Sequence, residues 1–212
     1  MPYSIASANK WLDSEIGRKI VFDTWQGALD IQFAQLPETE AQYDEHRALG
    51  GVNYKRQWIE YDLALMGLVR PGQKYLVFYE GGDDGYCGES ALPGDAYDKT
   101  ALVFLNGVKG TCAIWPRAAA PDAAPSWVDD IPFHELFHLF GAMHTPQILQ
   151  TQTMDEYTLK TCDLMYDPQQ CGNTGRRYVD RYRMYYYNPA GFSDPARPNL
   201  YFSPYFTPVK PQ

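Results

Sequence analysis

Three of the four histidines in this chain lie within one eleven-residue segment, HELFHLFGAMH, at positions 134–144. Residues four apart on an α-helix lie on the same face, so His134 and His138 can direct both imidazoles at one metal ion. Glu135 lies one position further round the helix, where it can hold a water molecule bound to that ion. The spacing therefore predicts a helix that binds a metal.

The end of the same segment predicts how a third ligand reaches the metal. Gly141 can adopt a positive φ and end the helix in a sharp turn, which would bring His144 back to the ion. Three neutral imidazoles with a fourth position open to water are typical of catalytic zinc, whereas structural zinc normally has four protein ligands. We therefore predict one catalytic Zn²⁺. The alternative is that these histidines pack on an amphipathic helix without a metal.

The complete pattern HExxHxxGxxH resembles the zinc signature of the metzincin clan of metallopeptidases. The segment CDLMYDP at 162–168 resembles the methionine turn of that clan, and its LMY is similar to the turn in matrix metalloproteinases. The resemblance places Met165 under the zinc site, although an ordinary core methionine is the alternative. In astacins and serralysins the tyrosine that can bind zinc lies two residues after the methionine. Here that position is Asp167, so Tyr166 is not a predicted ligand.

Five short segments outside the zinc motif carry a wider resemblance to secreted bacterial metzincin-like proteins: LDIQFAQLP, KYLVFYEGG, CGES, DLMY and SPYF. The resemblance implies an α+β fold with a two-lobed catalytic domain, in which a twisted mixed sheet and the active-site helix lie above a cleft. It implies a single catalytic domain over residues 1–212. The upper N-terminal lobe would cover 1–141, and an irregular lower C-terminal lobe would cover 142–212.

The function that the resemblance implies is a secreted zinc endopeptidase acting on protein or peptide substrates. Glu135 would serve first as general base and then as general acid in the hydrolysis of the peptide bond. The substrate would lie extended along a sheet edge, for which residues 111–116 are the candidate strand. The alternative is a catalytically silent zinc-containing module that binds a protein or a glycan.

Charge and composition limit the partners of this chain. The net charge of −8 argues against nucleic acid, because binding a polyanion requires a basic surface. No apolar run is long enough to cross a bilayer, so we expect no membrane partner. We expect a monomer.

The four cysteines, Cys87, Cys112, Cys162 and Cys171, include no CxxC pair. We therefore predict two disulfides and an extracellular protein whose leader has been removed, since the N-terminal residues do not resemble a secretory signal. Four cysteines allow three connectivities. We favour pairing Cys87 with Cys112 and Cys162 with Cys171 because these loops are shortest. The alternative is four buried free thiols in a cytosolic protein.

Hydrophobic periodicity predicts the elements before the zinc motif. Residues 28–36 alternate as a half-buried strand, with Leu29, Ile31 and Phe33 on one face. Residues 53–68 repeat apolar side chains every three to four positions, which predicts a helix.

Three short apolar runs follow that helix. The runs at 74–82 and 101–107 fit strands that are buried on both faces, and 111–116 fits a further strand at an edge. The zinc helix is expected at about 130–140. If Asp129 or Asp130 is its N-cap, Pro132 lies in the first turn, where its missing N–H is not needed.

The acidic loop EGGDDG at 80–85 could bind calcium through Asp83 and Asp84. A solvated turn is the better interpretation, because these residues are typical of turns. His46 is predicted to lie on the surface of a polar helix.

Overall fold

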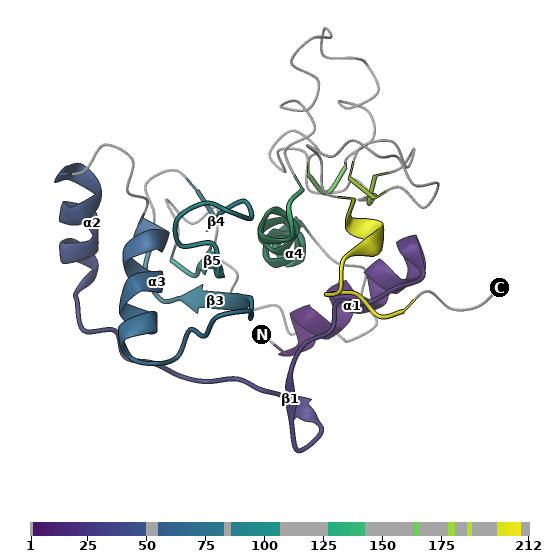
Figure 1. The fold of residues 1–212 in the computed structure, drawn as a ribbon, viewed down its shortest axis with the longest axis horizontal. Coiled ribbons are helices and arrows are strands. Elements are labelled where there is room, and N and C mark those ends of the chain that lie inside the picture. The colour runs from purple at the N-terminus through teal and green to yellow at the C-terminus, as the bar shows by residue number, and fades with distance from the viewer. Residues whose placement is uncertain are drawn as a thin grey trace, which may run out of the picture.

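The computed structural model describes residues 2–49, 55–82, 86–106, 127–142, 163–165, 178–180, 186–187 and 199–208. These residues form a mixed α+β structure (Figure 1), which confirms the α+β part of the predicted fold class. The described elements, in chain order, are α1 (Pro2–Ile16), β1 (Thr24–Trp25), β2 (Ala28–Leu29), α2 (Glu40–Leu49), α3 (Lys55–Leu65), β3 (Tyr75–Tyr79), β4 (Gly88–Ser90), β5 (Thr100–Phe104), α4 (Trp127–Phe140) and the 3-10 helix η3 (Leu200–Phe202).

The main sheet has the strand order β3-β5-β4. β5 pairs in parallel with β3 and antiparallel with β4, with Gly88 opposite Val103. Every residue of β5 is buried, whereas β3 is only half-buried. Both predicted strands are therefore confirmed in position, but only the central one is buried on both faces, since β3 lies at an edge of the described sheet.

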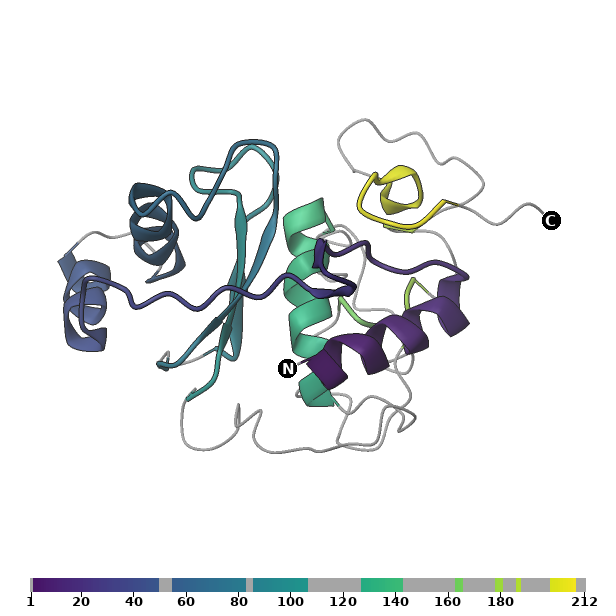
Figure 2. The same cartoon turned by 90° about the horizontal axis from the view of Figure 1, so that it is seen from below.

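Helices cover both faces of this sheet, with α3 on one face and α4 on the other, while α1 crosses α4 on the side away from the sheet (Figures 1 and 2). The central strand alternates between the two layers. Leu102 and Phe104 join the apolar cluster around α3, and Ala101 joins the larger cluster around α4 and α1. The zinc motif thus lies on a helix that is packed from both sides.

A buried arginine fastens the C-terminal segment to the end of α1. The Arg18 guanidinium donates hydrogen bonds to the carbonyls of Tyr201, Phe206 and Thr207. It also lies 5.3 Å from the ring centre of Phe206. The ring of Phe206 in turn packs edge-on against Phe137 of α4. Three parts of the chain that are distant in sequence therefore meet on the face of α4 opposite the sheet.

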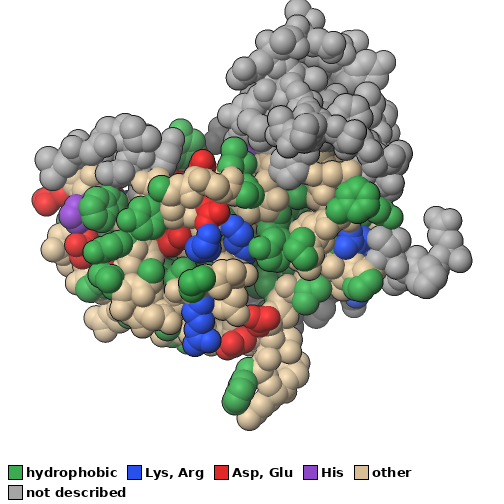
Figure 3. Space-filling model, viewed as in Figure 1, with side chains coloured by type: hydrophobic (Ala, Val, Ile, Leu, Met, Phe, Trp, Pro, Cys, Tyr) green, Lys and Arg blue, Asp and Glu red, His purple; other side chains and the backbone are tan. Residues whose placement is uncertain are grey.

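The strand predicted at 28–36 is wrong beyond its first two residues. β2 pairs only with β1, and the hairpin projects from the body of the molecule (Figure 3). Ile31 is 42% exposed and Phe33 is 91% exposed. Alternation alone does not make a half-buried strand, because a strand also needs a partner and a core to cover one face. Here residues 30–36 instead connect the N-terminal part to α2.

The helix predicted at 53–68 is confirmed as α3, but it buries a charged face. The residues that α3 buries are Lys55, Arg56, Ile59, Glu60, Asp62 and Leu63. Tyr61 is 41% exposed and Leu65 is 69% exposed, although both belong to the apolar repeat. α1 was not predicted.

The helix that carries His134 and His138 begins earlier than predicted. α4 starts at Trp127, so neither Asp129 nor Asp130 is its N-cap, and Pro132 lies inside the helix. An internal proline costs about 3 kcal/mol, because it removes one helical hydrogen bond and crowds the preceding turn. Burial of Ile131 and Phe133 beside it offsets that cost. The predicted edge strand at 111–116 lies outside the described residues.

Candidate metal centre and active site

Two histidines of α4 point their imidazoles at one another. The Nε2 atoms of His134 and His138 are 3.2 Å apart, and the two rings are perpendicular. The Nδ1 atom of His134 lies 2.6 Å from the carbonyl oxygen of Leu164, and that of His138 lies 2.7 Å from the carbonyl oxygen of Ala142. A carbonyl only accepts, so both Nδ1 atoms donate. In the neutral rings both Nε2 atoms then carry lone pairs that face each other.

Two facing lone pairs repel unless a cation lies between them. Zinc–nitrogen bonds of about 2.0–2.1 Å at a tetrahedral angle place two ligand nitrogens about 3.3 Å apart. The 3.2 Å between the Nε2 atoms of His134 and His138 matches that separation. Ligand histidines also usually donate their other N–H to a carbonyl or carboxylate, as both do here. These two residues therefore fit a zinc ion.

A tight turn at Gly141 ends the helix and supplies one of these carbonyls. Gly141 has a φ of 113°, and its N–H donates to the carbonyl of His138. The next N–H, that of Ala142, donates to the carbonyl of Phe137. This pair of bonds is the Schellman motif, which favours glycine at the left-handed position. The turn leaves the Ala142 carbonyl facing the His138 ring.

Glu135 lies on the same helix, with 7% of its surface exposed. Burial and the nearby charge of Glu89 raise the pKa of the Glu135 carboxyl to about 8, and Arg56 opposes the shift. A glutamate with so high a pKa keeps its proton near neutral pH, and it becomes a base only when a nearby positive charge lowers that pKa.

The backbone of β4 approaches Glu135 so closely that a side chain at position 88 would displace the Glu135 carboxyl. A Cβ atom built on Gly88 would lie 2.6 Å from the Cγ atom of Glu135 and 2.7 Å from its Oε1. Ordinary carbon contacts are about 3.5–4.0 Å. The strand edge therefore sets where the carboxyl group of Glu135 can lie.

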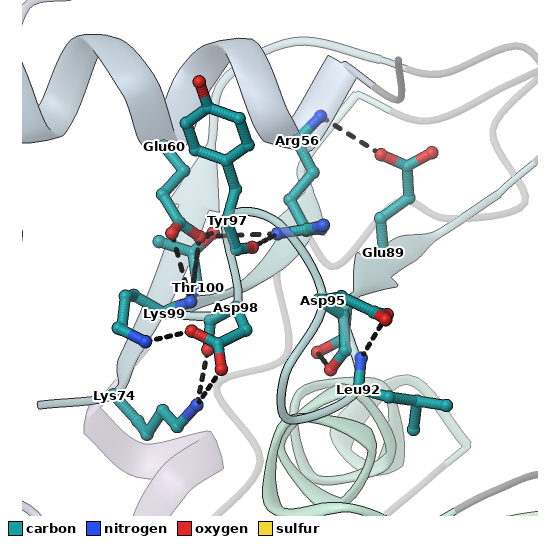
Figure 4. A network of polar contacts seen from close by, with 12 residues as sticks. Arg56, Glu60, Lys74, Glu89, Leu92, Asp95, Tyr97, Asp98, Lys99 and Thr100 are labelled. Carbon is teal, nitrogen blue, oxygen red and sulfur yellow. Dashed lines mark hydrogen bonds and ion pairs between the residues drawn. The ribbon is translucent and has the colours of Figure 1, made fainter. Parts of the chain in front are cut away.

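A buried polar network holds β4 and β5 against α3 (Figure 4). The backbone N–H of Arg56 donates to the carboxylate of Glu89 on β4. The Glu60 carboxylate accepts from the N–H groups of Lys99 and Thr100, from the Thr100 hydroxyl and from Arg56. α3 therefore fixes the start of the central strand and the edge strand that adjoins Glu135.

The turn at 163–165 packs against α4 and contacts His134 through the Leu164 carbonyl. Leu164 and Met165 are buried in the same apolar cluster as α4. The Leu164 carbonyl accepts the His134 Nδ1–H, and the Met165 N–H donates to the Asp163 carboxylate at 2.8 Å. The structure thus brings together His134, Glu135, His138 and the turn around Met165.

Several predicted site residues cannot be placed. His144, Tyr166, Asp83 and Asp84 lie outside the described residues, as do Cys112, Cys162 and Cys171. Within the described part of the chain, no group of three or more His, Cys, Asp or Glu side chains is arranged to hold a metal ion. Cys87 is disulfide-bonded. Its pairing with Cys112 stays a prediction.

Gly82, the residue before Asp83 in the acidic loop, already has a cationic partner. The buried ammonium of Lys55 donates to the Gly82 carbonyl at 2.6 Å and pairs with Asp44 at 2.5 Å. Glu40 also accepts the Gly82 N–H. Calcium binding at Asp83 and Asp84 stays a prediction that no described contact supports.

Sequence reasoning missed Gly88, Glu89, Arg56, Asp163 and Tyr186, all of which lie around the motif. The only signal was the short segment CGES, whose glycine is followed by an acid. Comparisons with models of protein families, with curated proteins and with solved structures give no match. Among the described residues, no helix is long and apolar enough to span a membrane.

Proposed function

We propose that this protein is a zinc-dependent endopeptidase. The observation that carries the proposal is the 3.2 Å approach of the His134 and His138 Nε2 atoms, with both Nδ1 atoms bound to carbonyls. Such an arrangement orients two imidazoles for one metal ion. The motif supplies His144 as the third ligand.

The residues around this pair support hydrolysis rather than a structural metal. When bound, zinc would acidify a water molecule and polarise the scissile carbonyl. Glu135 would take the proton from the attacking water as a carboxylate, the form that the charge of a bound zinc ion would favour. The same carboxyl then returns the proton to the leaving amine.

The edge strand β4 is the described strand best placed to bind the substrate. It pairs with β5 on one side and lies against α4, with Gly88 at the Glu135 carboxyl. An extended peptide added to this edge would bring its own backbone beside Glu135. We therefore propose β4, rather than 111–116, as the substrate-binding edge.

The proposed function also predicts how the chain is arranged around the site. We propose a single two-lobed metzincin-like domain with residues 1–141 above the cleft and 142–212 below it. The disulfide at Cys87 supports an extracellular location, because disulfides are rare in cytosolic proteins.

Two measurements test the proposal. The first is the zinc content of the purified protein after dialysis in zinc, which should be one ion per chain. The second is cleavage of casein and of a diverse peptide library by the wild type, by Glu135→Gln and after chelation. We expect cleavage by the zinc-loaded wild type alone. Zinc binding without any cleavage would refute the enzyme and favour the silent binding module, and a stoichiometry far below one would refute the metal site.

A further inference from the structure

We propose that Tyr186 is a positioning residue for the zinc ligand His134, acting through Asp163 and the backbone carbonyl of Leu164. This inference rests on the proposed function, because it assigns His134 to a metal. It concerns a residue far from the zinc motif in sequence. Tertiary packing brings its side chain next to the helix that carries the motif.

The hydroxyl of Tyr186 belongs to a hydrogen-bond network with Asp163 and Asp180. It donates to Asp163 Oδ1 at 2.7 Å and accepts the Asp180 N–H at 3.0 Å. The Asp180 carboxylate in turn accepts the N–H groups of Tyr186 and Tyr187 at 2.9 and 2.8 Å. Asp180 has a φ of 42°, an unusual value for a residue other than glycine. The phenol is therefore held at both its backbone and its hydroxyl.

The ring of Tyr186 is fixed as firmly as its hydroxyl. The side chain is only 2% exposed, and it packs edge-on against Phe137, with ring centres 5.9 Å apart. Phe137 lies on α4 next to His138. The same side chain therefore contacts the zinc helix with its ring and the methionine turn with its hydroxyl.

Asp163 transmits this position to the turn that carries Met165. The oxygen that accepts the Tyr186 hydroxyl also accepts the Met165 N–H at 2.8 Å. From the other side, the Leu164 N–H donates to the Tyr178 carbonyl at 2.8 Å. The peptide groups on both sides of Leu164 are thus held.

The Leu164 carbonyl, which these hydrogen bonds hold in place, orients the His134 ring. It lies 2.6 Å from Nδ1, which fixes the tautomer and the rotation of the ring. Loss of the Tyr186 hydroxyl would leave the Asp163 carboxylate with one bond fewer and free the turn to move. The His134 ring would then lose its fixed acceptor.

The test compares the full-length wild type with Tyr186→Phe and with the control Tyr187→Phe. The control removes the same atom from a neighbouring ring that is equally buried. Zinc affinity is measured by competition with a chromophoric chelator, and the visible absorption spectrum of the cobalt-substituted protein reports the ligand geometry. We expect Tyr186→Phe to weaken zinc binding roughly 10- to 100-fold and to change the cobalt spectrum. Tyr187→Phe should stay within about threefold of the wild type, well below that range.

A second pair of variants covers the case in which Tyr186→Phe does not fold. Asp163→Asn keeps the oxygen that accepts both hydrogen bonds and should retain wild-type zinc affinity, whereas Asp163→Ala should lose as much as Tyr186→Phe. The double variant Tyr186→Phe/Asp163→Ala should lose no more than either single one, because the two act in one path. Wild-type affinity and spectrum in Tyr186→Phe, or equal affinities of the Asn and Ala variants, would overturn the inference alone. A wild type that binds no zinc would overturn the proposed function as well.

Discussion

Replacing Gly88 with alanine should disable the Glu135 carboxyl while leaving the fold and the metal site intact. The added Cβ would lie 2.6 Å from the Glu135 Cγ and 2.7 Å from its Oε1. Restoring an ordinary carbon contact requires a movement of about 1 Å. The atoms that must move belong to a side chain, so we expect a stability cost of only about 1 kcal/mol.

The expected loss of activity follows from that displacement. A catalytic group misplaced by about 1 Å lowers the rate roughly 100-fold. That factor corresponds to about 2.7 kcal/mol of transition-state stabilisation. In Gly88→Ala, kcat/KM for a peptide substrate should therefore fall by about two orders of magnitude. The atoms nearest to the new methyl group all belong to Glu135, so zinc content should stay at one per chain.

The assay is cleavage of a quenched fluorescent peptide, with zinc content and thermal unfolding measured on the same samples. Ser90→Ala is the matched control, since it changes one small side chain on the same strand. We expect it to lower kcat/KM far less than Gly88→Ala does, because an added strand is bound mainly through main-chain hydrogen bonds. Full activity in Gly88→Ala would refute the reasoning, because Glu135 would then not need the place that β4 leaves for it.

Three further predictions concern stability and the buried acids. Arg18→Ala should lower the free energy of unfolding by about 3 kcal/mol, since it leaves three carbonyls without their charged donor; chemical denaturation checks this, and a loss below 1 kcal/mol would contradict it. Glu60→Ala should cost about 3 kcal/mol, because the N–H groups of Lys99 and Thr100 lose their acceptor, whereas Glu60→Gln should cost less, as urea unfolding would show. Burial raises the pKa of the Asp163 carboxyl to about 7 from an unfolded value near 3.8. Between these two pH values the folded state binds one proton more than the unfolded state. The free energy of unfolding should therefore fall as the pH rises from about 4 to 7, by at most about 4 kcal/mol. That fall should disappear in Asp163→Asn when both proteins carry Glu135→Gln to remove the second buried acid, and an unchanged pH dependence would contradict the assignment.

The sequence predicted the part of the site that depends on local spacing. His134, Glu135 and His138 share one helix, so the helical repeat alone brings them together. Gly141 follows the same logic, since a helix end requires a left-handed residue. Gly88 and Tyr186 act through tertiary contacts instead, and their local sequence does not show those contacts.

The wrong predictions about the fold have a common physical cause. Periodicity assumes that apolar residues face the core, but α3 buries Arg56 and Glu60 because each charge finds several partners there. Residues 30–36 continue the same alternation but join no sheet in the described part of the chain. Pro132 was expected at a helix start because its local cost is known, whereas the packing that offsets the cost is not visible in sequence.

The hydrogen bonds between Arg18 and the C-terminal segment can form only late in the synthesis of the chain. The guanidinium and the Thr207 carbonyl are 189 residues apart in the chain. Synthesis runs from the N-terminus at about 5–20 residues per second, so α1 emerges many seconds before its partners. α4 also emerges before the segment at 199–208 that packs on Phe137 and Phe140. The rings of Phe137 and Phe140 therefore stay open to chaperones and proteases until the segment at 199–208 has been made.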